Sequence, residues 1–256
     1  MVMHLTFVVA ICIGICVGVS AQDIVVYSPG DEGTTSTPYP FTIEEAGLAS
    51  MRYQQVFNRS DFSLMDGRGG YITQIYLFYG AGRHIDKVIT NIQLRFSTTQ
   101  KTADGLSQVF DENVGADDTL VYGGLPLALK TDSPESFFVA AIALQQPFFY
   151  SSGDGNLLLD VRNFTGAAKD PFAIPEFGIY PGTLDAERTF GDSVSSVYSF
   201  SVDAPSGSFN TAGLVMGFRI SAVPEPSTGK LVAGAIVMLS ILGVRRQFYF
   251  IGRTEK

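Results

Sequence analysis

The sequence predicts an all-β fold, an antiparallel two-sheet sandwich of the jelly-roll type, flanked by an N-terminal signal helix and a C-terminal transmembrane helix. Three observations lead to this prediction. Short segments alternate apolar and polar residues with the period of two that is typical of half-buried strands. Clusters rich in Gly, Ser and Pro separate these segments. The body has no long helical period, so its strands must bury their apolar faces against one another in layers.

Eight segments of the body carry strand patterns. In the clearest, 88–97, the residues Ile92, Leu94 and Phe96 alternate with polar side chains. Such alternation predicts one strand face in the core and one in water. In segment 157–162, the same pattern places Asp160 and Arg162 on the solvent face. Segments 71–79 and 137–144 are apolar on both faces and are expected to be central strands. The other candidates are 52–57, 119–122, 157–162, 196–202 and 214–220, and residues 28–40 are expected to form an irregular lead.

Residues 1–21 have the length and composition of a secretory signal peptide. An apolar run from Leu5 ends at Val19-Ser20-Ala21, which places small or medium-sized side chains before a cut at Gln22. The segment before the run lacks Lys and Arg, in contrast to most such leaders, and a buried strand or helix is the alternative. Cleavage before Gln22 would remove both cysteines, so the body, residues 22–222, would have neither disulfides nor a thiolate nucleophile.

Residues 223–256 have the composition of a second targeting segment. An apolar stretch at about 229–244 ends at Arg245-Arg246, whose charges predict the cytoplasmic side of a membrane. Its continuously apolar part, residues 231–244, is shorter than the roughly 20 residues of a membrane helix. Including residues 226–230, with the Lys230 amine reaching towards the interface, brings the segment closer to that length. A buried core helix is the alternative. Prolines in the preceding motif keep the backbone extended and accessible to a processing enzyme; this motif is Val223-Pro224-Glu225-Pro226-Ser227-Thr228.

This tail resembles the PEP-CTERM sorting signal of exopolysaccharide-producing Gram-negative bacteria. The resemblance covers residues 223–246, namely the Pro-Glu-Pro motif, the apolar stretch and Arg245-Arg246 in that order, together with a signal peptide at the other end. Residues 247–256 depart from the pattern, because such tails usually stop soon after the arginines. The resemblance implies recognition at the inner membrane by an exosortase, a transpeptidase-like enzyme, and cleavage near Pro224-Glu225-Pro226. The body would then be released or re-attached at the cell surface or in the extracellular matrix.

Three segments of the body are similar to a domain that recurs in PEP-CTERM proteins. They are RYQQVF at 52–57, GYITQI at 70–75 and GNLLLDV at 155–161. This second resemblance is looser than the first, and it implies no settled activity.

The body is acidic and poor in reactive side chains. It carries 12 basic and 23 acidic residues, which gives a formal net charge of −11. Nucleic-acid binding needs a basic surface and is therefore not expected. His84 is the single histidine of the body, which excludes zinc sites with two or three histidines, and no Gly-x-Ser-x-Gly elbow accompanies it. A loop position is the simplest interpretation of His84.

Carboxylates are the remaining candidates for chemistry. Two of them could act as acid and base in glycoside cleavage, which only their separation in space decides. Acidic residues near turns could also hold a structural calcium ion, although EF-hand spacing and tandem Gly-Asp repeats are absent. Turn formation and solvated surface are the alternatives. The catalytic candidates are Glu44, Glu45, Asp111, Glu112, Asp117, Asp118, Glu176 and Glu187, and the calcium candidates are Asp104, Asp117, Asp118, Asp154 and Asp160.

Sugar binding is a further hypothesis, because aromatic rings can stack on the apolar faces of sugars. The chain has no Trp, but several tyrosines of the body could serve, and packing in or beside the core is the alternative. The candidates are Tyr27, Tyr39, Tyr76, Tyr122, Tyr150 and Tyr180.

Together these patterns predict an exported, surface- or matrix-associated protein without enzymatic activity. Its expected partners are an exosortase and, before processing, the inner membrane. A glycan-binding module associated with exopolysaccharide is the alternative function, and a carbohydrate-active enzyme is a third hypothesis. No cofactor is expected apart from a structural calcium ion.

Overall fold

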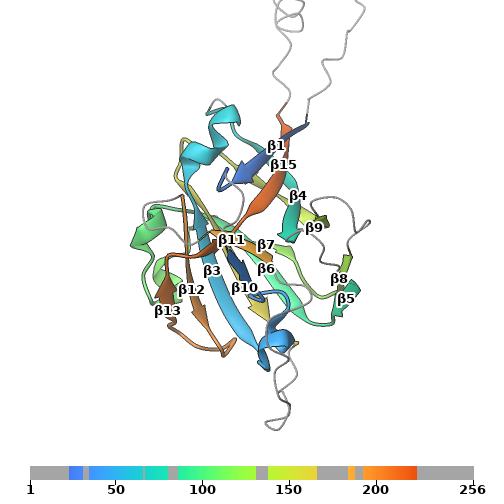
Figure 1. Cartoon of the computed structure of the whole chain (residues 1–256). Helices are drawn as coiled ribbons and strands as arrows, with labels where there is room; N and C mark the ends of the chain where they lie inside the picture. The colour runs from blue at the N-terminus through green and yellow to red at the C-terminus, as the bar shows by residue number, and fades with distance from the viewer. Residues whose placement is uncertain are drawn as a thin grey trace, which may run out of the picture. The chain divides into compact units, whose positions relative to one another are not determined.

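Antiparallel strands make up almost all the regular structure of the computed structural model (Figure 1). The structure describes residues 23–30, 35–65, 67–79, 86–130, 138–165, 184–187 and 193–223. None of the helices in these ranges has the length and apolar composition needed to span a bilayer. The predicted signal helix and the predicted transmembrane helix lie outside the described residues.

The first sheet has seven strands. Its hydrogen-bonded order is β1-β15-β4-β11-β14, with β2 paired to β11 and β9 paired to β4. The strand β4 is therefore central, as its sequence predicts. The prediction that segment 137–144 is also a central strand is wrong, because β9 pairs with β4 alone among the described strands. The strands are β1 (Asp23–Ser28), β2 (Thr35–Thr37), β4 (Gly70–Tyr79), β9 (Phe138–Tyr150), β11 (Leu184–Glu187), β14 (Gly213–Leu214) and β15 (Met216–Ala222).

The second sheet has six strands in the order β13-β12-β3-β10-β6-β7. They are β3 (Met51–Phe57), β6 (Ile92–Thr99), β7 (Thr119–Tyr122), β10 (Asn156–Asn163), β12 (Val194–Ser199) and β13 (Ser208–Asn210). A separate pair joins β5 (Asp86–Ile89) to β8 (Leu127–Lys130). Four short 3-10 helices complete the described elements: η1 (Ile43–Ala46), η2 (Arg59–Met65), η3 (Ala103–Gly105) and η4 (Phe110–Glu112).

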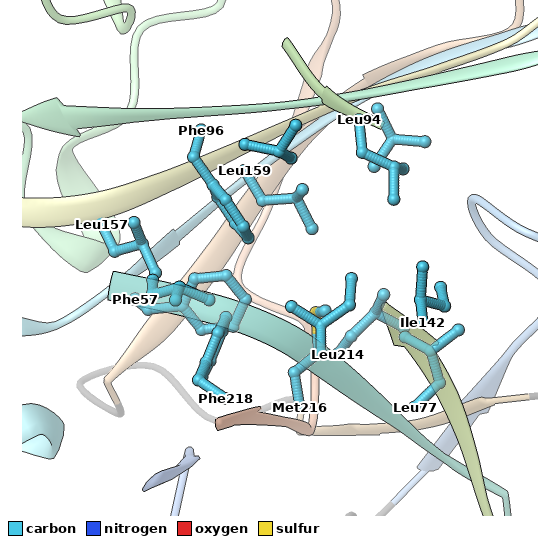
Figure 2. Packing of buried hydrophobic residues seen from close by; sticks show 14 of the residues in the cluster. Phe57, Leu77, Leu94, Phe96, Ile142, Leu157, Leu159, Leu214, Met216 and Phe218 are labelled. Atoms are coloured by element: carbon cyan, nitrogen blue, oxygen red, sulfur yellow. The ribbon is translucent and has the colours of Figure 1, made fainter. Parts of the chain in front are cut away.

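The main core lies between the two sheets and is built around Phe218 of β15. This ring is fully buried, and its centroid lies 5.0 Å from that of Phe57, 5.3 Å from that of Phe62 and 6.3 Å from that of Phe96. Each buried side chain of this size stabilises the fold by about 1.5–3 kcal/mol through apolar burial. Figure 2 shows the two sheets contributing to this cluster, with Phe57, Leu94, Phe96, Leu157 and Leu159 from one, and Leu77, Ile142, Leu214, Met216 and Phe218 from the other.

A second, smaller core covers the other face of the second sheet. The segment 103–114, which carries η3 and η4, folds over this face and buries Leu158 of β10. The prediction that Asp160 faces water is therefore wrong, since only 4% of Asp160 is exposed. Both faces of β3 and β10 are buried because a segment distant in sequence covers the face that alternation assigns to solvent. The cluster contains Val56, Ala103, Leu106, Phe110, Leu158 and Val197.

The predicted strand 88–97 is wrong in its first half. Residues 86–89 form β5, which pairs with β8, and Val88 is 57% exposed. The break lies at Asn91, whose N–H donates to Thr165 Oγ1 at 2.7 Å and whose carbonyl accepts from Phe164 N at 3.0 Å. These bonds occupy the backbone groups that a continuous strand would use. The expected irregular lead at 28–40 also contains β2, while the predicted strands 52–57, 71–79 and 119–122 are confirmed.

Phe218 provides a test of the core. We expect Phe218→Ala to lower the free energy of unfolding by about 3–5 kcal/mol, because the fully buried ring leaves a cavity between the sheets. The control is Phe149→Ala, which removes a ring that is 45% exposed. Urea denaturation of both variants measures the difference, and equal destabilisation would contradict this description of the core.

Candidate functional site

The two ends of the described fold lie side by side in the first sheet. The strands β1 and β15 pair antiparallel, so that Asp23 is opposite Ser221, whose hydroxyl donates to Asp23 Oδ1 at 2.5 Å. Figure 1 shows β1 next to β15. The first residue after β15, Val223, is 46% exposed. The other predicted processing residues lie outside the described residues: Val19, Ala21, Gln22, Pro224, Glu225, Pro226, Ser227, Thr228, Arg245 and Arg246.

A buried ion pair occupies the outer face of the second sheet. Asp160 Oδ2 accepts hydrogen bonds from Arg52 Nη2 at 2.9 Å and from Gln54 Nε2 at 2.8 Å. The Arg52 guanidinium also lies 3.3 Å from the Asp111 carboxylate and 4.4 Å from the centroid of the Phe110 ring. Both charges of the central pair are almost completely shielded from water. Such a pair is strongly destabilising when one partner is removed, because the other charge stays buried.

Asn113 joins this pair to the covering segment. Its side-chain amide donates to Gln54 Oε1 at 3.0 Å and to the Ser107 carbonyl at 2.8 Å, and its Oδ1 accepts from Ser107 N at 2.7 Å. Asn113 thus links Gln54 of the sheet to Ser107 of the covering segment 103–114 by hydrogen bonds. This arrangement holds the segment in place over the sheet.

Most of the candidate carboxylates within the described ranges are engaged with neighbouring groups. Asp118 accepts three hydrogen bonds from Arg95, two from Nε at 2.9 and 3.0 Å and one from Nη2 at 2.7 Å, and this bonding raises the pKa of Arg95. Glu44 pairs with Lys87, and Glu112 accepts from the Ser107 hydroxyl at 2.6 Å. These contacts stabilise loops and strand ends. His84 and Glu176 lie outside the described residues, and the side chains of Glu45 and Glu187 are not described.

The calcium candidates occupy separate turns and strand ends. Asp117 Oδ1 accepts from Thr98 N at 2.7 Å, Asp104 lies in η3, and Asp154 lies in the turn before β10, where its N–H donates to the Ser151 carbonyl at 3.1 Å. Over the described ranges, no three His, Cys, Asp or Glu side chains are grouped as metal ligands. The calcium hypothesis stays a prediction.

The tyrosine candidates divide between the core and the surface. Tyr150 is buried and donates to the Gly155 carbonyl at 2.9 Å, and Tyr122 donates to the Pro126 carbonyl at 2.9 Å. Tyr27 is exposed, and Tyr76 is half-buried on the same outer face of the first sheet. Tyr39 is half-buried beside the end of β12. Tyr180 lies outside the described residues.

Further rings lie on this outer face of the first sheet. The rings of Tyr27 and Phe78 meet edge to face with centroids 5.6 Å apart, and those of Tyr71 and Phe149 do so at 5.3 Å. The face also carries Arg219, whose guanidinium lies 5.8 Å from the Tyr76 ring. We call these residues the outer aromatic face.

A groove of about 500 Å³ lies beyond the end of β12, in its connection to β13. We call it the serine-aromatic groove. Phe200 is 52% exposed, and its ring belongs to a group with Tyr198 and Tyr39 in which the centroids lie 5.6 to 5.7 Å apart. The lining residues are Tyr198, Ser199, Phe200, Ser201, Ser206, Gly207 and Ser208.

The far wall of the serine-aromatic groove rests on the segment that covers the second sheet. Phe110 N donates to the Pro205 carbonyl at 3.1 Å, and Gly207 N donates to the Gln108 carbonyl at 2.8 Å. A Cβ atom on Gly207 would lie 2.5 Å from the Tyr198 carbonyl oxygen and 2.8 Å from Phe110 Cζ. Only glycine therefore permits this close approach.

The sequence pattern did not identify this groove. It places Tyr198, Phe200 and Val202 on one face of a single strand, but β12 ends at Ser199 and the Phe200 ring turns towards water. The run of serines around two aromatic residues, in SVYSFSVDAPSGS at 196–208, is the signal that could have marked it. Such a run is unusual for a strand that packs into an apolar core.

The buried ion pair can be tested against an exposed one. We expect Asp160→Asn to lower the free energy of unfolding by about 3 kcal/mol, because the Arg52 charge stays buried with a weaker set of partners. The matched change Asp118→Asn breaks the half-exposed pair with Arg95 and should cost about 0–1 kcal/mol. Urea denaturation gives both values, and a larger loss in Asp118→Asn would contradict the structural role of Asp160.

Two buried tyrosines should make the stability of the fold sensitive to alkali. Burial raises the pKa of Tyr53 and of Tyr150 above the ordinary value of 10.0. Because the unfolded chain loses these protons first, the free energy of unfolding should be unaffected below about pH 10 and fall as the pH rises further. The slope of the free energy of unfolding against pH is measured by urea denaturation at several values between about pH 9 and pH 11.5. Tyr150→Phe should make this slope less steep, and an unchanged slope in that variant would refute this assignment.

Comparison with known proteins assigns no relative to this chain. No family model, curated protein or solved structure matches it. Its function is therefore proposed from its own residues.

Proposed function

We propose that the chain is an exported, membrane-anchored precursor whose β-sandwich body is displayed at the cell surface or in the extracellular matrix after processing by an exosortase. The observation that carries this proposal is the position of the fold between the two predicted targeting segments. Every described strand lies within residues 23–222, and β1 pairs with β15. Cuts before Gln22 and near Pro224-Glu225-Pro226 would remove both segments without removing a strand.

The membrane steps of the proposal rest on the terminal sequences. The segment 1–21 would act as the signal helix, and about 229–244 as a transmembrane helix in the inner membrane, with Arg245-Arg246 on the cytoplasmic side. The resemblance to PEP-CTERM tails supports the choice of an exosortase as the processing enzyme. The anchor would hold the motif at residues 223–228 at the membrane face, within reach of a membrane-bound enzyme.

The finer fold assignment is a jelly-roll-like sandwich. Two connections between consecutive strands support it, because the chain passes from β3 in the second sheet to β4 in the first, and from β9 in the first sheet to β10 in the second. We propose no enzymatic activity for this sandwich. The support is that Asp118, Asp111 and Glu44 pair with basic side chains, which fits structural roles.

A glycan-binding module associated with exopolysaccharide is the second candidate function. The serine-aromatic groove favours it, because a half-exposed ring lies among several hydroxyl groups. Binding of exopolysaccharide would retain the processed body in the matrix without a covalent link. The two functions are compatible, since one concerns delivery and the other concerns retention.

The delivery proposal predicts a defined mass for the mature protein. In an exosortase-containing host, the body should begin at Gln22 and end within or beside residues 224–226, because the cuts fall outside the strands. Glu225→Gln should accumulate as a longer chain that retains Lys256, because the motif loses its carboxylate. Intact-mass measurement of protein recovered from the envelope and the medium checks both outcomes.

The matched control is Asp203→Asn, which makes the same change from carboxylate to amide at an exposed position of the body. It should be processed like the wild type. Recovery of the wild-type chain with its C-terminal residues intact, or normal processing of the Glu225→Gln variant, would argue against the proposal.

A further inference from the structure

We propose that the serine-aromatic groove binds a short, uncharged oligosaccharide, with one sugar ring stacked on Phe200 and its hydroxyl groups bonded to the serine wall. This inference rests on the proposed glycan-binding function, and it names the site and the ligand class. The groove volume of about 500 Å³ falls within the roughly 300–1,000 Å³ of small-ligand sites.

The aromatic side of the groove is held in place before any ligand arrives. The centroid of the Phe200 ring lies 5.7 Å from that of Tyr39 and 5.6 Å from that of Tyr198, and both tyrosines are half-buried against the main core. An exposed ring supported in this way loses little conformational freedom on binding. Its apolar face fits the C–H face of a sugar ring, which gains by leaving water.

The polar side of the groove offers hydroxyl groups that are free to bond. The hydroxyls of Ser201, Ser206 and Ser208 have no hydrogen-bond partner within the described ranges. A serine hydroxyl donates one hydrogen bond and accepts others, as a sugar hydroxyl does. Their backbone is fixed by the bond from Phe110 N to the Pro205 carbonyl and by the Val109–Ser206 bridge. The wall can therefore pair with ligand hydroxyls without reorganising.

The lack of basic residues in the groove and the acidity of the body around it disfavour acidic sugars. None of its lining residues is charged, and the body around it has a formal net charge of −11. A polyanionic glycan would find no basic partner in the groove and would be repelled by the body. A neutral oligosaccharide needs no basic partner and is not repelled by the negative charge of the body.

The groove also lies at the far end of the body from the chain ends. β12 starts with Val194 opposite Phe57 and finishes with Ser199 opposite Arg52. The Val194 end of β12 thus lies beside Phe57, whose ring packs against Phe218 of β15. The last residue of β15, Ala222, is opposite Gly70 of β4, and Gly70 in turn is opposite Tyr150 of β9. In Figure 1 the arrowhead of β12 accordingly points away from the start of β1. The groove therefore lies at the opposite end of β12 from the end at which the chain enters and leaves the fold.

The test uses the purified full-length chain in a zwitterionic detergent without a sugar headgroup. Isothermal titration calorimetry is run with maltotriose, cellotriose and laminaritriose as neutral probes and with trigalacturonate as the charged probe. At least one neutral trisaccharide should bind saturably, and trigalacturonate should not. Phe200→Ala should weaken that binding by at least about tenfold, since a central aromatic contact is lost.

Two further variants make the result specific. Phe149→Ala removes a ring of similar exposure on the outer aromatic face and should leave binding unchanged. The double variant Ser206→Ala/Ser208→Ala keeps Phe200 and should weaken binding by about three- to tenfold. Because Phe200, Ser206 and Ser208 are all exposed, both groove variants should keep the wild-type unfolding midpoint in urea.

The outcomes separate the site from the function. If no neutral trisaccharide binds the wild type, the glycan-binding function and the groove assignment are both overturned. If the wild type binds but Phe200→Ala and the double serine variant bind equally well, glycan binding stands and the groove assignment is overturned. Tighter binding of trigalacturonate through Phe200 would overturn the selection for uncharged sugars.

Discussion

The buried pair of Arg52 and Asp160 organises the second sheet. Two buried charges in a mostly apolar setting are costly unless neighbouring groups compensate them. Gln54 donates to Asp160 Oδ2, and Arg52 also contacts Asp111 and the Phe110 ring, whereas Arg52 Nε and Asp160 Oδ1 have no hydrogen-bond partner among the described residues. The segment 103–114 must therefore stay in place over the sheet. Phe110 in turn bonds to Pro205 through its backbone, which sets the far wall of the serine-aromatic groove. One ion pair thus connects the centre of the sheet to the proposed binding surface.

The double burial of β3 and β10 also explains how the body can be stable without disulfides. A domain without cysteines depends on its cores for stability. Here one cluster lies between the sheets around Phe218, and a second lies under η3 and η4 around Leu158. Each core shields the same two strands from a different side, so their backbone hydrogen bonds are protected on both faces. The edges and loops are then free to carry recognition.

The two ends of the body suit two different tasks. At one end, β1 and β15 pair so that the chain enters and leaves the sheet at neighbouring positions. At the other, the connection from β12 to β13 exposes Phe200 among serines. This separation keeps the groove away from the end at which the chain enters and leaves the fold. Retention by a glycan and release by a processing enzyme can therefore act without competing for the same surface.

Features that depend only on neighbouring residues can be predicted from short stretches of the chain. Leu94 and Phe96 alternate with polar neighbours, so short windows of sequence are enough to find strand segments. The Pro-Glu-Pro motif, the apolar stretch and Arg245-Arg246 likewise follow one another within a short window, from which a targeting segment is predicted. The tertiary structure alone decided that Asp160 is buried, that β5 leaves the second sheet, and that Phe200 faces water. Each of these depends on contacts between residues far apart in the chain, such as Arg52 with Asp160 or Gln108 with Gly207. Periodicity assigns residues to two faces of a strand, but it does not say which remote segment covers a face.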